Sequence, residues 1–118
     1  MRVLIADDDH DVAGTLALFV QDCGHDVTTV TTGGLDVLKS YERFRPDLVI
    51  MDVIMPRFNG ITTSHALLSK NPGAKLVLMS GQLGSEHPFL ASAGASHFLS
   101  KPLRLTEIKT LLDEIAAN

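Results

Sequence analysis

The chain has 118 residues, 45% of them apolar and 20% charged, which is typical of one globular domain with a core of its own. A net charge of -4 without a basic run argues against nucleic acid as a direct partner, and one Cys excludes an internal disulfide or a multi-cysteine metal site. No apolar stretch approaches the roughly 20 residues of a membrane span, so no membrane partner is expected. Because a predicted strand begins at Val3, we expect no signal peptide and a cytoplasmic location.

Strands and helices alternate along the whole chain. In chain order, strands are predicted at 3–6, 26–30, 48–51, 76–79 and 98–100, and helices at 10–23, 34–44, 60–70, 86–93 and 105–116. Two helices have a clear apolar stripe that we expect to be buried. The stripe of the first helix consists of Val12, Leu16, Phe19, Val20 and Cys23, and that of the last consists of Ile108, Leu111, Leu112 and Ile115.

This alternation predicts right-handed crossovers and a three-layer α/β fold around a doubly wound parallel sheet. The strand at 26–30 mixes Asp and Thr with Val, which is typical of an edge strand. The runs at 3–6, 48–51 and 76–79 are fully apolar, which is typical of strands buried on both faces. The expected strand order is therefore 2-1-3-4-5, the flavodoxin-like order, with residues 1–118 forming a single domain.

Polar side chains follow four of the predicted strands. Asp7 and Asp8 come after the first strand, Asp52 after the third, Ser80 after the fourth and Lys101 after the fifth. Parallel strands side by side bring these groups to one end of the sheet, at the point where the strand order reverses. Carboxylates a few Å apart repel by about 4 kcal/mol near a protein surface, so the group must protonate or bind a cation. Oxygen ligands favour Mg²⁺, and a carboxylate beside a metal, an ammonium and a hydroxyl is able to accept a phosphoryl group.

Four sequence pieces resemble the receiver domain of two-component response regulators, and together they cover essentially the whole chain. They are Leu4–Asp9, Pro46–Pro56 followed by Gly60, Leu78–Gly81, and Gly94-Ala95 followed by Lys101–Leu103. The resemblance implies a phosphorelay signalling module, with Asp52 accepting a phosphoryl group from a histidine kinase or a histidine phosphotransfer protein. It also implies that Asp7, Asp8, Asp52 and the backbone carbonyl of Ile54 hold Mg²⁺.

The resemblance assigns further roles near the ends of the last two strands. Ser80 is the switch hydroxyl, Lys101 contacts the phosphoryl group, and a cis peptide before Pro102 aims that lysine. Phe98 takes the position of the switch aromatic residue. Phosphorylation would change the surface formed by the predicted helix at 86–93, the last strand and the last helix, which would bind a downstream target protein or a covalently linked output domain.

Two side chains stand at positions that control dephosphorylation in the resembled family. Ile54 lies two residues beyond Asp52, and Gln82 lies two residues beyond Ser80. The resemblance implies that both influence how water reaches the phosphoryl group. The domain is then not an enzyme, although it supports its own phosphorylation and slow dephosphorylation. The sequence leaves open whether it is a stand-alone regulator or part of a longer protein.

An alternative is a small aspartate-nucleophile phosphohydrolase of the haloacid dehalogenase type. Asp9-His10-Asp11 followed by Gly14-Thr15-Leu16 superficially matches the opening motif of that family, but the spacing differs by two residues. The two hypotheses differ in the phosphorylated residue, which is a first-strand aspartate in the hydrolase and Asp52 in the receiver. A third hypothesis, a docking domain with a vestigial site, conflicts with the complete set of acidic, hydroxyl and ammonium groups.

Overall fold

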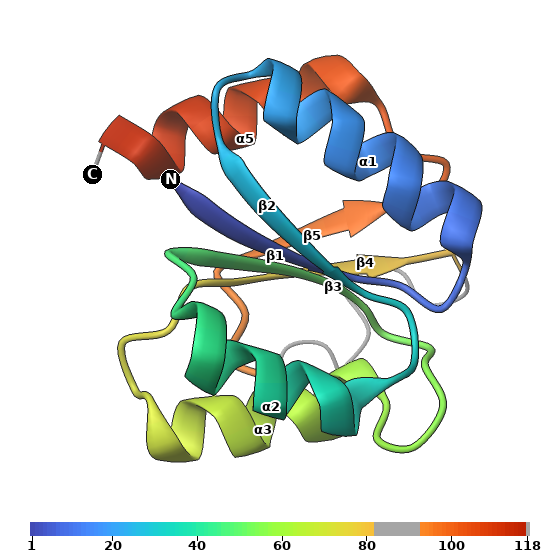
Figure 1. Ribbon diagram of the computed structural model, residues 1–118, viewed down its shortest axis with the longest axis vertical. Coiled ribbons are helices and arrows are strands. Elements are labelled where there is room, and N and C mark those ends of the chain that lie inside the picture. The colour runs from blue at the N-terminus through green and yellow to red at the C-terminus, as the bar shows by residue number, and fades with distance from the viewer. Residues whose placement is uncertain (82–92, 118) are drawn as a thin grey trace.

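The computed structural model describes residues 1–81 and 93–117, which form a parallel sheet with helices on both faces (Figure 1). The strands are β1 (Arg2–Ala6), β2 (Asp26–Val30), β3 (Leu48–Asp52), β4 (Leu76–Ser80) and β5 (His97–Ser100). The helices in the described ranges are α1 (His10–Asp22), α2 (Gly34–Phe44), α3 (Gly60–Lys70) and α5 (Leu105–Ala117). The order β2-β1-β3-β4-β5 confirms the predicted topology and fold class. Gln82 and all but the last residue of the helix predicted at 86–93 lie outside the described residues.

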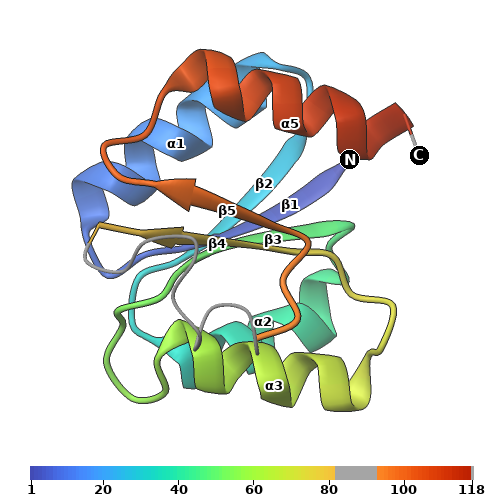
Figure 2. The same ribbon diagram turned by 180° about the vertical axis from the view of Figure 1, so that it is seen from behind.

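The sheet separates two apolar cores. Helices α1 and α5 cover one face, and α2 and α3 cover the other (Figure 2). Along β1, Val3 and Ile5 pack into the core beneath α1 and α5, whereas Leu4 and Ala6 pack into the opposite core. Burial of each Val, Leu or Ile side chain contributes roughly 1.5–3 kcal/mol. The central strands are therefore packed on both faces, which fixes the positions of the residues that directly follow their carboxyl ends.

The predicted stripe of α5 is confirmed, because Ile108, Leu111, Leu112 and Ile115 are all buried. The predicted stripe of α1 was partly wrong. Its buried residues are Ala13, Leu16, Ala17 and Val20. Phe19 and Cys23 are only half-buried at the flank of the core, and Val12 is also half-buried. The buried residues follow the i, i+3, i+4, i+7 spacing of one helix face, which includes Ala13 and Ala17.

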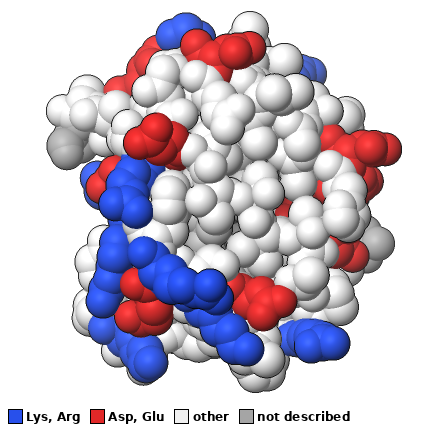
Figure 3. All heavy atoms as spheres, in the orientation of Figure 1, with Lys and Arg blue, Asp and Glu red and all other residues white. Residues whose placement is uncertain are grey.

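Basic side chains gather on the α2–α3 side although the chain carries net negative charge. Figure 3 shows them over the lower part of this face, where Figure 1 places α2 and α3. Lys39 and Arg43 of α2, Arg45 just after it and Lys70 of α3 are exposed. Arg43 and Lys70 lie in the last turns of their helices, where positive charge interacts favourably with the helix dipole.

None of the described helices has the length and apolarity needed to cross a membrane.

The first residue of α3 lies directly against the end of β3. The Gly60 amide donates to the Val53 carbonyl at 2.7 Å. A Cβ atom at Gly60 would lie less than 3.0 Å from the Asp52 carbonyl oxygen and from the Val53 Cα. Both of those atoms belong to backbone that the sheet holds in place. Glycine at this position therefore allows α3 to begin immediately beside the residues that carry the site.

We expect Gly60→Ala to lower the free energy of unfolding by about 1–3 kcal/mol, because the added methyl group overpacks fixed backbone. Gly14→Ala is the matched control, since a Cβ at Gly14 in α1 meets nothing within 4 Å. That control should gain roughly 0.5–1 kcal/mol from reduced backbone entropy in the unfolded chain. Urea unfolding followed by circular dichroism measures both. Equal stability of the two variants would contradict the proposed close packing.

Candidate functional site

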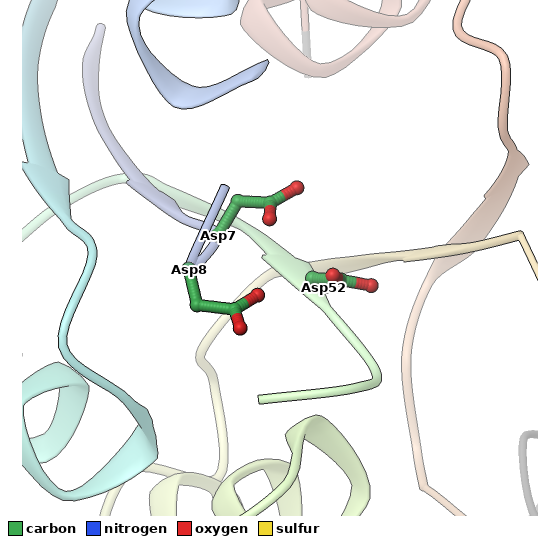
Figure 4. Close-up of side chains that lie close together, drawn as sticks. All are labelled: Asp7, Asp8 and Asp52. Atoms are coloured by element: carbon green, nitrogen blue, oxygen red, sulfur yellow. The ribbon is translucent and has the colours of Figure 1, made fainter. Parts of the chain in front are cut away.

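Three carboxylates converge at the carboxyl end of the sheet. Asp7 and Asp8 directly follow β1, and Asp52 is the last residue of the neighbouring strand β3. One carboxylate oxygen from each residue lies within 4.8 Å of the other two (Figure 4). Asp7 is fully buried and Asp52 is 6% exposed, whereas Asp8 is exposed. The cluster is therefore held mainly within the protein and is open to solvent on the side of Asp8.

Lys101 bridges the two buried carboxylates. Its Nζ atom lies 2.6 Å from Asp7 Oδ2 and 3.1 Å from Asp52 Oδ2. The Lys101 backbone N–H donates to the Ser80 carbonyl at 2.9 Å, so the hydrogen bonding between β4 and β5 continues one residue beyond β5. The peptide bond from Lys101 to Pro102 is cis. The last strand thus delivers an ammonium group to carboxylates on two other strands.

Backbone amides hold the second oxygen of each buried carboxylate. Asp7 Oδ1 accepts from the Asp9 N–H at 2.9 Å, and Asp52 Oδ1 accepts from the Ile54 N–H at 3.4 Å. Both contacts join a side chain to the amide two residues further on, as in an Asx turn. The two carboxylates therefore have the same arrangement, with one oxygen on an amide and the other on the Lys101 ammonium.

The pKa of Asp52 stays raised despite its contacts with Lys101 and Ile54. Burial raises the pKa of Asp52 above its ordinary value, and the charge of Asp7 raises it further. The bond to Lys101 and the Ile54 amide lower the pKa of Asp52 only in part. For Lys101, burial lowers the pKa, but the hydrogen bonds to Asp7 and Asp52 outweigh burial and the net shift is upward. Additional positive charge beside Asp52 would therefore be favourable.

The remaining predicted site residues lie around this cluster. Ser80 is the buried last residue of β4, and Ile54 exposes 48% of its surface just after β3. Phe98 is half-buried against the core on the α2–α3 face, with its Cα opposite that of Leu78. Gln82 falls outside the described ranges. Direct contacts thus join Lys101 to Asp7 and Asp52, while the backbone bond to Lys101 places Ser80 at the same edge.

The segment that matched the hydrolase motif has a different structural role. The Asp9 carboxylate caps α1 by accepting hydrogen bonds from the backbone N–H groups of Asp11 and Val12. His10 to Leu16 then form the first turns of that helix. Among the described residues, the acidic groups close enough to share a cation do not include Asp9 or Asp11. This geometry disfavours the hydrolase alternative.

Sequence reasoning did not identify the amides of Asp9 and Ile54 as site groups. Their contribution comes from the backbone, so side-chain types carry no direct sign of it. The available signal was positional: each aspartate stands where a strand gives way to a turn, and an Asp there commonly bonds the amide two residues later.

We expect Asp52→Asn to raise the melting temperature by a few degrees at pH 7 in metal-free buffer. The folded-state pKa of Asp52 is raised, so its stabilising contribution is present below the unfolded pKa and is lost as pH rises through the folded pKa. The neutral amide avoids this loss, and Lys101 keeps its bond to Asp7. Thermal unfolding in EDTA across pH 3 to 8 should show the advantage shrinking toward acidic pH.

The control for that measurement is Asp26→Asn, at an exposed carboxylate on the edge strand β2. It should change the melting temperature little at any of these pH values. An Asp52→Asn variant that is less stable than the original protein at pH 7 would show that the Lys101 bond outweighs burial and repulsion.

Comparisons with known proteins agree with this geometry. The family model described as "Response regulator receiver domain" matches residues 3–113. The chemotaxis protein CheY of Treponema pallidum is 32% identical over 120 residues, covering 98% of this chain and 81% of that protein. The response regulator MprA of Mycobacterium leprae is 34% identical over 109 residues, covering 92% of this chain and 47% of that longer protein.

Solved structures show the same fold. A putative response regulator from Chloroflexus aurantiacus has a TM-score of 0.89 at 27% identity, covering 99% of this chain and 98% of that one. The response regulator TrrA of Thermotoga maritima, solved in complex with Mg²⁺-BeF, has a TM-score of 0.87 at 24% identity and covers 97% of each chain. With the model match spanning nearly all its residues, the chain belongs to the receiver domain family of two-component response regulators.

Proposed function

We propose that this receiver domain accepts a phosphoryl group on Asp52, in a Mg²⁺-dependent reaction, from the phosphohistidine of a kinase or phosphotransfer protein. The observation that carries the proposal is the pairing of Asp52 with a positive group and two further carboxylates. Its Oδ2 lies 3.1 Å from Lys101 Nζ, and its carboxylate shares the 4.8 Å cluster with Asp7 and Asp8. Among the described carboxylates, only Asp7 and Asp52 combine a lysine partner with a place in this three-carboxylate cluster, and Asp7 is the fully buried one of the two.

The donor set fits Mg²⁺. Hard carboxylate oxygens suit this ion, which keeps several waters and needs only a few protein ligands. Asp7, Asp8, Asp52 and the Ile54 carbonyl would hold it, and TrrA, which shares the fold, was solved with Mg²⁺-BeF. When bound, the ion would supply charge neutralisation for the carboxylates and for the transferring phosphoryl oxygens. The raised pKa of Asp52 is consistent with this proposal, because burial and, second, the charge of Asp7 disfavour its ionised form, and a bound cation would favour that form.

The chain's own residues would carry the transfer. An oxygen of ionised Asp52 attacks the phosphorus of the donor, a P–O bond forms and the P–N bond to the donor imidazole breaks. The leaving imidazole takes the electron pair and a proton from solvent. The Lys101 ammonium, which already contacts Asp52, then bonds a phosphoryl oxygen and stabilises charge that develops there. Asp7 holds Lys101 in place through its bond at 2.6 Å.

Asp52→Asn should abolish incorporation of label from ³²P-acetyl phosphate in the presence of Mg²⁺, because the amide is not a competent nucleophile. Asp11→Asn, at an exposed carboxylate in the first turn of α1, is the matched control and should be labelled at the normal rate. Asp8→Asn should be labelled only at higher Mg²⁺ concentration. Undiminished label on the Asp52 variant, or label mapped to Asp7 or Asp9, would refute the assignment.

Phosphorylation would act as a switch through Ser80 and Phe98. The buried Ser80 lies at the end of β4, and the added phosphoryl oxygens provide its hydroxyl with a strong acceptor. Movement of this hydroxyl would free space for the half-buried Phe98 ring, which then favours a more buried rotamer. The surface around β5 and α5 would change with it and alter affinity for partners.

Ser80→Ala should bind Mg²⁺ and beryllofluoride, a phosphoryl mimic, without moving Phe98. The ring signals of Phe98 measured by NMR should shift in the original protein and stay near their starting positions in the variant. Ser100→Ala is the control, because Ser100 faces Ser80 in the strand register but is exposed. A full Phe98 shift in Ser80→Ala would eliminate the hydroxyl as the link.

We also infer that Ile54, together with Gln82, tunes the lifetime of the phosphorylated form. Hydrolysis requires a water in line with the aspartyl phosphate. The Ile54 side chain stands 48% exposed two residues from Asp52 and offers no hydrogen bond to hold that water. Gln82 is able to bond a water but is not a base. The phosphorylated domain should therefore persist longer than one with a polar side chain at position 54.

Ile54→Asn should accelerate loss of ³²P from labelled protein, because an amide is able to orient the attacking water. Mg²⁺ affinity should stay the same, since the proposed ligand at this position is the backbone carbonyl. Leu105→Asn is the control, because it places the same amide at another exposed apolar residue, 43% exposed, and it should leave the decay unchanged. Identical decay curves for all three proteins would show that this side chain does not control water access.

The proposed partners are a phosphohistidine donor and a downstream target or linked output domain, with no nucleic acid or membrane bound directly. A hollow of about 700 Å³ lies between α1 and the chain after β5, lined by Val12, Leu16, Leu103 and Lys101 among others. Its apolar walls beside the phosphoryl-contacting lysine suit a donor protein approaching Asp52. MprA, in which the match covers 47% of the protein, supports a linked output domain as one arrangement.

A further inference from the structure

The loop between β3 and α3, residues 53–59, has a strained backbone. Arg57 has a φ of 60° and Phe58 has a φ of 125°. Residues other than glycine rarely adopt positive φ, and for a bulky residue such as Phe the conformation is unfavourable. Such a conformation persists only where the surrounding structure imposes it. This loop also carries the Ile54 carbonyl, the proposed backbone ligand of the metal.

The start of α2 supplies the surface that imposes this conformation (Figure 1). The Gly34 amide donates to the Pro56 carbonyl at 3.4 Å. A Cβ at Gly33 would lie less than 3.0 Å from the Pro56 carbonyl oxygen, and a Cβ at Gly34 would lie equally close to the Phe58 carbonyl oxygen and to Thr63 Oγ1. Gly33 itself has a φ of 129°, which L side chains rarely adopt. Two adjacent glycines thus let the loop rest directly on the backbone of α2.

The loop is also held at its two ends. The Val53 amide donates to the Met79 carbonyl at 2.9 Å, and the Gly60 amide donates to the Val53 carbonyl at 2.7 Å. Val53 and Met55 are both buried, at 1% and 7% exposure. Ile54 stands between these two anchored residues, with its amide on Asp52 Oδ1. Pro56, whose carbonyl accepts from Gly34 at the start of α2, lies only two residues beyond Ile54. A displacement of the loop from α2 would therefore pull on the short stretch of backbone that presents the Ile54 carbonyl.

We propose that Gly33 and Gly34 are positioning residues for the metal and phosphoryl site, because they seat the loop that presents the Ile54 carbonyl. The proposal rests on the function proposed above. Mg²⁺ requires near-ideal octahedral geometry, so a preset carbonyl reduces the reorganisation that binding demands. By linkage, an ion that uses this carbonyl also stabilises the contact between the loop and α2. The contact between the loop and the start of α2 is in this way coupled to Mg²⁺ binding at the carboxyl ends of β1 and β3.

The coupling is tested first in the unaltered protein, by hydrogen exchange at single amides with and without MgCl₂. The Gly34 N–H bonds the Pro56 carbonyl, so its exchange should slow as Mg²⁺ is added, with the same midpoint as the chemical-shift changes of Asp8 and Asp52. The Ala74 amide, bonded to the Asn71 carbonyl beyond the far end of α3, is the control and should change little. Unchanged Gly34 exchange alongside a clear response at Asp8 and Asp52 would overturn the inference. No response at any of them would instead refute the proposed metal site.

The second test compares Gly34→Ala with Gly14→Ala. Gly34→Ala should raise the Mg²⁺ dissociation constant by about tenfold, the size of effect typical of groups that orient metal ligands. It should also slow labelling of Asp52 by acetyl phosphate at fixed Mg²⁺. Gly14→Ala, which adds a methyl group in open space, should leave both unchanged. A Gly34→Ala protein that is less stable but binds Mg²⁺ normally would show a merely structural role. If that variant does not fold, the exchange of the Gly34 amide decides the question.

Discussion

Repulsion among the carboxylates of Asp7, Asp8 and Asp52 is the constraint on which the rest of this structure depends. Oxygens of like charge within 4.8 Å of one another, two of them on buried residues, are costly unless a cation offsets them. Lys101 lies against Asp7 and Asp52, yet the pKa of Asp52 stays raised, first because of burial and second because of the charge of Asp7. The ionised form of Asp52 is therefore disfavoured, which would make the site receptive to a cation and, in the proposed reaction, to a phosphoryl group. An unfavourable local interaction in the folded state is thus the source of the proposed chemistry.

The cluster persists because burial of the strands beneath it stabilises the fold by far more free energy than the repulsion among the carboxylates costs. Val3 to Ala6 and Leu48 to Met51 are almost completely buried, on strands packed between two helical layers. Many apolar side chains, each contributing roughly 1.5–3 kcal/mol, outweigh a few kcal/mol of repulsion at the edge. The same difference in free energy separates two roles along each strand. The apolar run stabilises the fold, and the polar residue at its carboxyl end contributes to the site.

Periodicity was sufficient to predict the sheet order and the residues at its carboxyl edge. Apolar runs that end in Asp7, Asp52, Ser80 and Lys101 determine which strands are central and which side chains meet. Contacts made by backbone atoms were harder to predict. The amides of Asp9 and Ile54 and the seat formed by Gly33 and Gly34 depend on how turns pack in three dimensions, and their sequence signals are short and common. The buried stripe of α1 was also harder to predict, since it includes Ala13 and Ala17, small residues that a search for bulky apolar side chains passes over.

The bond from Lys101 to Asp7 joins residues 94 positions apart in sequence. Asp7 directly follows the first strand of the domain to be synthesised, and Lys101 follows the last. During synthesis of the domain, Asp7, Asp8 and the proposed acceptor Asp52 are therefore present before Lys101. A nascent or truncated chain that ends before Lys101 has the carboxylates without the group that binds two of them together. The set of charged groups is thus complete only once the last strand of the sheet has been added, so that an incomplete chain would lack the assembled site proposed to meet a phosphoryl donor.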